Sequence, residues 1–157
     1  MRTKLEYIIN DLKDCFDGKP WYGDSLMKKL TAIDWRLANE KIYGDKTIAV
    51  LVQHIINWRI FVLKKLQGDA TYDVIIDQLN DWTPRLVNNE QEWLLLLQEI
   101  YNTQNDILAF LADSEDTLLD RIVPGKKYTF GPILKSLSQH DIYHLGQIAM
   151  LNSSAKS

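Results

Sequence analysis

The stretch 46–67, KTIAVLVQHIINWRIFVLKKLQ, is the part of the sequence that says most about the fold. Its apolar residues cover most of a helical circumference: Ile48, Val50, Leu51, Val52, Ile55, Ile56, Trp58, Ile60, Phe61, Val62, Leu63 and Leu66. A helix that is apolar nearly all round is buried among other elements. Asp45 or Thr47 can cap its start, and Gly68 suits the position just past its end. We therefore expect a long, largely buried helix here.

One amphipathic helix precedes this stretch. Apolar residues recur at the i, i+3, i+4, i+7 spacing of a helix at Leu5, Ile8, Ile9, Leu12 and Phe16. Gly18 and Pro20 then end the pattern. Cys15 lies beside the same stripe, and we expect it to be a small buried apolar filler rather than a catalytic thiol.

Two amphipathic helices follow the central stretch. One starts near Asn89, where Glu92 can complete a capping box, and ends at Asp113. Its inner face is marked by Trp93, Leu96, Leu97, Ile100, Leu108 and Leu111. The other starts at the Gly131-Pro132 step, because proline suits the first helical turn. Its stripe consists of Ile133, Leu137, His140, His144, Ile148 and Leu151.

The connections between these helices are roughly 20 to 30 residues long, which is more than a structureless loop usually has in a compact domain. The first connection contains the helical fragments 24–30 and 34–41, and no alternating strand pattern of useful length occurs. The sequence therefore predicts an all-α fold, a four-helix bundle with long crossover connections, as a single domain over 1–157.

Composition excludes several classes of function. The chain has 157 residues, of which 46% are apolar and 25% charged, with a net charge of −3. This balance argues against a general binder of nucleic acid or of an anionic membrane. The longest apolar runs, 48–52 and 93–97, are far shorter than the ~20 residues of a membrane-spanning helix. With one cysteine and no apolar leader at the N-terminus, we expect a cytoplasmic protein without an intramolecular disulfide.

The chain has three histidines, His54, His140 and His144. His140 and His144 are four residues apart on an apolar stripe, so both imidazoles share one inward face of the last helix. His54 lies near the middle of the central helix, with Leu51 and Trp58 on the same face. If the two helices touch, the three rings meet at one level of the bundle.

Three neutral imidazoles at one level can ligate a borderline divalent metal and leave positions open for water or substrate. The alternative is three ordinary core histidines with hydrogen-bond partners. Gln147 and Asn57 follow His144 and His54 by three residues and could hydrogen-bond a ligand histidine or a metal-bound water. Gly146 costs the helix about 1 kcal/mol relative to Ala, which suggests close helix packing.

The segment 140–144 also resembles the His-Glu-x-x-His box of metalloproteases, with Asp141 in the Glu position. The aspartate is one methylene shorter, and the third histidine would come from upstream, whereas those enzymes take it from downstream. We therefore do not expect a protease.

The stretch 139–148, QHDIYHLGQI, resembles the C-terminal signature of the DinB/YfiT-like superfamily of metalloenzymes. His54 with Trp58 resembles its upstream His-x-x-x-Trp motif, with the Thr-Ile-x-x-Leu-Val helix start at Thr47. The segment 20–23 and the Glu92-Trp93 pair resemble two further family segments, so the resemblance covers nearly the whole chain.

This resemblance implies a bundle with up-down-down-up topology and a divalent metal, zinc or nickel, held by His54, His140 and His144. It implies a small-molecule substrate, a homodimer, and a metal-dependent transferase that uses a low-molecular-weight thiol such as bacillithiol, mycothiol or glutathione. It names no catalytic residue beyond the ligands. Two alternatives stay open: a metal-dependent hydrolase, and a non-enzymatic metal-binding or assembly bundle, since no unambiguous acid, base or nucleophile flanks the histidines.

Overall fold

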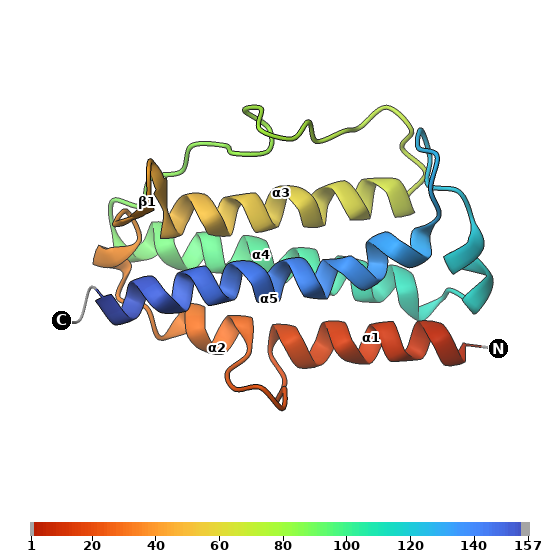
Figure 1. The fold of residues 1–157 in the computed structure, drawn as a ribbon, viewed down its shortest axis with the longest axis horizontal. Helices are drawn as coiled ribbons and strands as arrows, with labels where there is room; N and C mark the ends of the chain where they lie inside the picture. Colours follow the sequence, from red (N-terminus) through yellow and green to blue (C-terminus); the bar gives the residue numbers. More distant parts are fainter. Residues whose placement is uncertain (1, 155–157) are drawn as a thin grey trace.

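Four long helices form the bundle: α1 (Thr3–Phe16), α3 (Ile48–Leu66), α4 (Glu90–Ala112) and α5 (Phe130–Ser154). The computed structural model describes residues 2–154, with side chains except at 42, 43 and 151–154. In Figure 1, α1 and α5 run in one direction and α3 and α4 in the other, which is the expected up-down-down-up topology. α3 packs against α4 and α5, and α1 packs against α5 and α4. The all-α prediction is confirmed.

Short elements complete the first connection: α2 (Leu26–Thr31), the 3-10 helix η1 (Trp35–Leu37) and the strands β1 (Lys41–Tyr43) and β2 (Lys46–Thr47). α2 continues the line of α1, and both helices lie along α5 (Figure 1). The helical fragment expected over 34–41 is wrong beyond the short η1. The chain must reverse just before α3, and Gly44, with a φ of 57°, permits the tight turn of a hairpin.

The predicted helix boundaries follow from local capping. Thr47 accepts a hydrogen bond from the backbone N–H of Val50 and caps α3, which starts at Ile48 rather than at Lys46. Gly68, with a φ of 91°, occupies the position past the end of α3 where a left-handed conformation is needed. Asn89 caps α4 through the N–H of Glu92.

The bundle interior has two apolar clusters with a polar layer between them. One cluster surrounds Leu51 and Leu145, and the other surrounds Phe61 and Leu137. Between them lie the buried polar side chains of this layer: His54, Asn57, Arg59, Thr103, Gln104, Asp141 and His144. Leu151, expected to continue the inward stripe of α5, lies outside the described side chains. The polar layer is therefore where the fold concentrates its buried chemistry.

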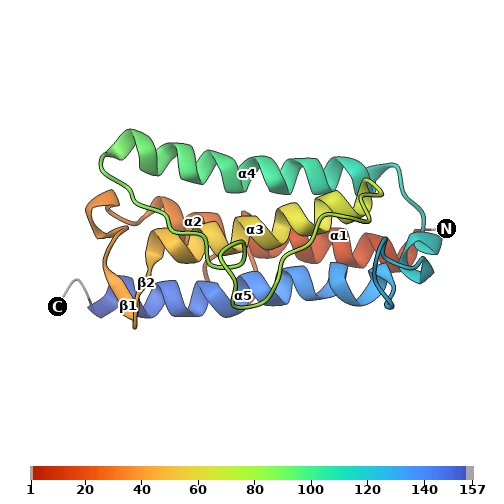
Figure 2. The ribbon, with the colours of Figure 1, turned by 90° about the horizontal axis from the view of Figure 1, so that it is seen from above.

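The connection 67–89 joins two parallel helices and must return along the full length of the bundle. Figures 1 and 2 show it running over α3 on the outside of the molecule. At its midpoint Asp81 is buried, so this connection is packed against the polar layer rather than free in solvent. A final short helix, η2 (Asp116–Asp120), lies between α4 and α5. None of the helices within residues 2–154 has the length and apolarity that a membrane crossing requires.

Candidate metal centre

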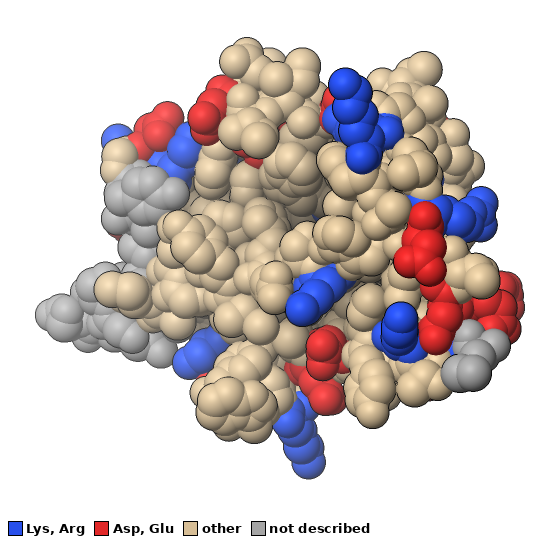
Figure 3. Space-filling model, turned by 45° about the vertical axis from the view of Figure 1, so that its right-hand side comes forward, with Lys and Arg blue, Asp and Glu red and all other residues tan. Residues whose placement is uncertain are grey.

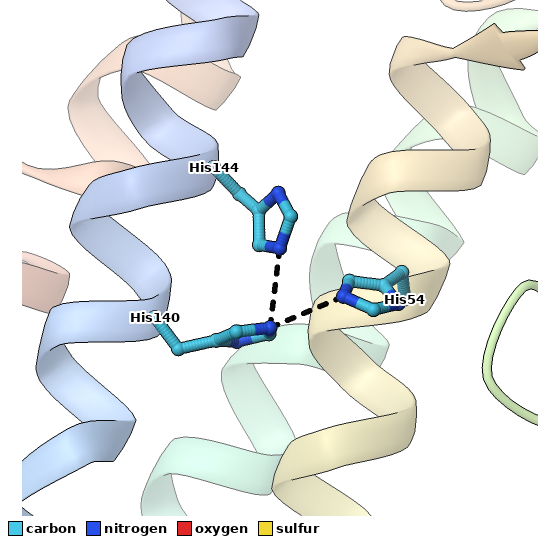
Figure 4. Close-up of side chains that lie close together, drawn as sticks. All are labelled: His54, His140 and His144. Carbon is cyan, nitrogen blue, oxygen red and sulfur yellow. Dashed lines mark hydrogen bonds between the residues drawn. The ribbon is translucent and has the colours of Figure 1, made fainter. Parts of the chain in front are cut away.

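The three histidine rings meet in the polar layer, one from α3 and two from α5 (Figure 4). The Nε2 atom of His140 lies 3.1 Å from the Nε2 atoms of both His54 and His144. One nitrogen from each ring lies within 4.8 Å of the other two. The predicted convergence of the three histidines is confirmed.

Hydrogen bonds on the far side of two rings set their tautomers. His54 Nδ1 lies 3.1 Å from the backbone oxygen of Asp81 and 2.9 Å from its carboxylate. His144 Nδ1 lies 2.6 Å from the side-chain oxygen of Gln147. These partners are acceptors, so each Nδ1 carries the proton and donates it. Both Nε2 atoms therefore present lone pairs to the centre of the cluster.

His140 cannot satisfy both neighbours by hydrogen bonding. If its Nε2 carries a proton, it can donate that proton to only one of the two facing lone pairs. If its Nε2 is unprotonated, three lone pairs face one another, and its Nδ1 carries the proton although it is buried with no partner. A cation at the centre removes this conflict, because all three lone pairs can then bind it.

The two nitrogen separations that involve His140 suit such a cation. Two nitrogens bound at about 2.05 Å to one tetrahedral zinc are separated by about 3.3 Å. The observed separations of 3.1 Å are close to this value. His54, His140 and His144 are thus the residues that could hold a divalent metal, while their role as ligands stays a prediction.

Burial keeps these imidazoles neutral. Desolvation, with the neighbouring histidines adding to it, lowers the pKa of His140 to about 3. Desolvation likewise lowers the pKa of His144 to about 4 and also lowers that of His54. A neutral imidazole is the form that binds metal, so near pH 7 the cluster does not have to lose protons first.

A match to a family model covers residues 24–148 and therefore includes all three histidines; its description is the DinB superfamily. The match spans most of the chain. This protein belongs to the DinB superfamily. Compared with curated proteins and with solved structures, the chain has no significant match.

Asp81 is one residue beside the histidine cluster that sequence reasoning missed. Its carboxylate accepts hydrogen bonds from the indole N–H of Trp58, at 2.8 Å, and from the backbone N–H of Asp77, at 2.9 Å, in addition to its contact with His54. A carboxylate behind a histidine fixes the ring orientation and raises its basicity. Asp81 therefore ties the connection 67–89 to the ring of His54.

Trp82 was missed as well. Its ring stacks on His54 with centroids 3.9 Å apart and planes 9° from parallel. The ammonium of Lys46 lies 4.3 Å from the centre of the same indole ring. Trp82 thus covers the outer face of His54 and reduces its access to solvent.

The two predicted supporting residues have different roles. Gln147 contacts His144 directly, as expected. Within the described part of the chain, Asn57 has no hydrogen bond to a histidine but donates to the backbone oxygen of Asp81 and to the hydroxyl of Thr83. Asn57 therefore supports the connection that carries Asp81, one step further from the cluster than predicted.

Three other residues singled out in the sequence lie away from the cluster. Asp141 is fully buried and pairs with Arg59 on α3, so it cannot serve as the general base of a protease-like box. Cys15 is buried, and burial raises the pKa of its thiol, as suits an apolar filler. Gly146 has open space where a side chain would stand, so the expectation of close helix packing there is wrong.

Proposed function

We propose that this protein is a divalent-metal-dependent enzyme, a thiol-dependent transferase that uses zinc or nickel. The observation that supports this most is the convergence of three imidazole lone pairs at one point of the polar layer. The group of candidate ligands found among residues 2–154 consists of these three histidines. Three protein ligands with further positions left for other molecules are typical of a catalytic site rather than of a closed structural one.

A metal in this position would bind the sulfur of a small thiol and favour its thiolate form. The protein's own part is to hold the ligands. Asp81 and Gln147 fix the protons of His54 and His144 on the side away from the centre, and Trp82 shields His54 from water. Asp141, the carboxylate nearest in sequence, is committed to Arg59.

The charge distribution supports a small-molecule substrate rather than nucleic acid. On the face drawn in Figure 3, basic and acidic side chains are interspersed, and no continuous basic area is visible. The net charge of −3 agrees. A homodimer and a cytoplasmic location are further parts of this proposal, and light scattering of the purified protein tests the first.

The test is metal analysis after purification without chelator. We expect about one equivalent of zinc or nickel per chain, and loss of that metal in His54→Ala, His140→Ala and His144→Ala. Gln139→Ala is the matched control, because Gln139 is exposed and lies next to His140 on α5. Protein that is metal-free and also refuses added Zn²⁺ and Ni²⁺ would contradict the proposal.

Activity separates the three kinds of function. Bacillithiol, mycothiol and glutathione, each offered with an epoxide or an aryl chloride, should give a metal-dependent thioether product. Hydrolysis of an ester with no thiol requirement would indicate the metal-dependent hydrolase instead. Full metal content with neither reaction, together with reduced thermal stability of the alanine variants, would indicate the non-enzymatic bundle.

A further inference from the structure

An apolar pocket of about 270 Å³ adjoins the histidine cluster between α3 and α5. Its walls include Trp58, Phe61 and Val62 on α3, and Leu137 and His140 on α5. These α3 residues lie one to two turns after His54, so the pocket runs from the cluster towards the start of α5. His140 is both a wall of the pocket and a member of the cluster.

Three polar groups around this pocket already have partners. The indole N–H of Trp58 donates to Asp81, and the hydroxyl of Ser136, at the rim, donates to the backbone oxygen of Ile133. The ammonium of Lys126 lies 5.6 Å from the ring of Phe61, but both carboxylate oxygens of Asp73 bind it at 2.7 Å. A charged ligand group would therefore lose its hydration without gaining a counter-ion, which favours an uncharged occupant.

The walls favour an aromatic occupant over a merely apolar one. The rings of Trp58 and Phe61 meet at 71° with centroids 5.5 Å apart, and Trp58 meets His140 at 64° with centroids 6.3 Å apart. Rings set at steep angles to one another offer both faces and edges, and aromatic pairs prefer such edge-to-face contacts. The hydrogen bond to Asp81 holds Trp58 in this orientation before any ligand arrives.

The size of the pocket limits the ligand to one ring. A cavity of about 150 Å³ lined by apolar side chains holds benzene, so about 270 Å³ leaves room for a benzene ring with a small substituent. We propose that the pocket binds an uncharged, monocyclic aromatic group of the substrate and places the group's reactive substituent beside His140. This inference rests on the proposed function, because it identifies the substrate class of the same site.

The probe for the pocket is 4-fluorobenzyl alcohol, followed by fluorine NMR with zinc-loaded protein. We expect saturable binding, and at least tenfold weaker binding in Ser136→Trp, whose indole would fill the pocket from its exposed rim. Ser136→Asp, which adds a charge at the same position, should weaken binding to a similar degree and serves if the tryptophan variant fails to fold. Gln139→Trp, on α5 but outside the pocket, should bind the probe like the unaltered protein.

Two further measurements separate this inference from the proposed function. With Co²⁺ in place of Zn²⁺, the fluorine of the bound probe should relax faster, because the paramagnetic ion would lie at the pocket end formed by His140. 4-Fluorobenzoate, which has the same ring and a negative charge, should bind metal-free protein at least tenfold more weakly than the alcohol does, because no metal is then present to hold its carboxylate. No saturable binding of the alcohol to protein with full metal content, equal binding by Ser136→Trp, or equal binding of the benzoate and the alcohol to metal-free protein would overturn the pocket assignment. Protein that takes up no metal would instead overturn the proposed function.

Discussion

Two buried polar clusters occupy the same layer of the bundle, and adjacent residues of α5 belong to them. His140 faces His54 and His144, whereas Asp141 faces Arg59. Consecutive helical residues point about 100° apart, so α5 can serve both clusters at once. The first cluster brings together three groups of the same kind, and the second pairs opposite charges.

The second cluster finds most of its partners within the chain, although the Nε atom of Arg59 and the Oδ1 atom of Asp141 are buried without a hydrogen-bond partner. The guanidinium of Arg59 binds Asp141 and the side-chain oxygen of Gln104, which lies 2.7 Å away, and it also lies over the ring of Phe16. Gln104 in turn donates to the backbone oxygen of Leu12. This cluster therefore connects all four long helices through groups of the chain itself.

The histidine cluster differs at its centre and in its surroundings. Its central nitrogens face one another without enough protons, and it borders a pocket through the half-buried His140. A buried polar group without a partner is costly, so its persistence in a fold needs an explanation. The difference teaches that the ion pair holds the bundle together, whereas the histidines are arranged for something that comes from outside the chain.

The largest effect is expected from breaking the ion pair. Arg59→Met leaves the carboxylate of Asp141 buried without its partner, and such a loss costs about 3–5 kcal/mol of unfolding free energy. The double variant Arg59→Met/Asp141→Leu removes both charges and should recover much of that loss. Urea denaturation at pH 7 measures both values.

The metal content of the same Arg59→Met variant tests whether the ion pair and the histidine cluster are independent. Folded Arg59→Met protein should still bind about one equivalent of Zn²⁺, because the guanidinium of Arg59 donates its hydrogen bonds to Gln104 and Asp141 and not to the histidines. If Arg59→Met kept its unfolding free energy but no longer bound Zn²⁺, the ion pair would support the metal site rather than the stability of the bundle.

An intermediate effect is expected at Asp81. Asp81→Asn keeps the shape of the side chain but removes the charge behind His54, and changes of this kind weaken metal binding about 10–100-fold. Competition with a chromogenic chelator measures the affinity for Zn²⁺. Asp77→Asn is a suitable control, since Asp77 meets Asp81 only through its backbone N–H. If Asp81→Asn and the control bound Zn²⁺ with equal affinity, the role of Asp81 would be limited to holding the connection 67–89 against the bundle.

Much of the fold was predictable because it depends on local signals. The helical spacing of apolar residues and the caps at Thr47, Gly68 and Asn89 gave the four helices to within a few residues. The hairpin was not predictable in the same way, because its two strands are too short to show an alternating pattern. Its position follows from the need to reverse the chain at Gly44.

The site was predictable only in part, for a related reason. The histidines meet because of their positions along two helices, and the helical periodicity of the sequence makes those positions visible. Asp81 and Trp82 come from a connection whose path depends on tertiary packing, and no periodicity marks them. Arg59 and Asp141 are charged residues that usually face solvent, so nothing in the sequence separates this buried pair from surface charges.

The smallest effect is expected at Gly146, which lies on a third face of α5, away from both clusters. No other atom of the described residues lies near the place where a Cβ atom of residue 146 would stand, and the residue is several turns away from the start of α5. Gly146→Ala should therefore raise the unfolding free energy by up to about 1 kcal/mol, because alanine has less conformational freedom to lose on folding. The same urea denaturation measures it, and zinc affinity should stay unchanged. If the zinc affinity instead rose together with the unfolding free energy, the flexibility of α5 would be weakening metal binding in the unaltered protein. Stability and metal binding would then not be independent.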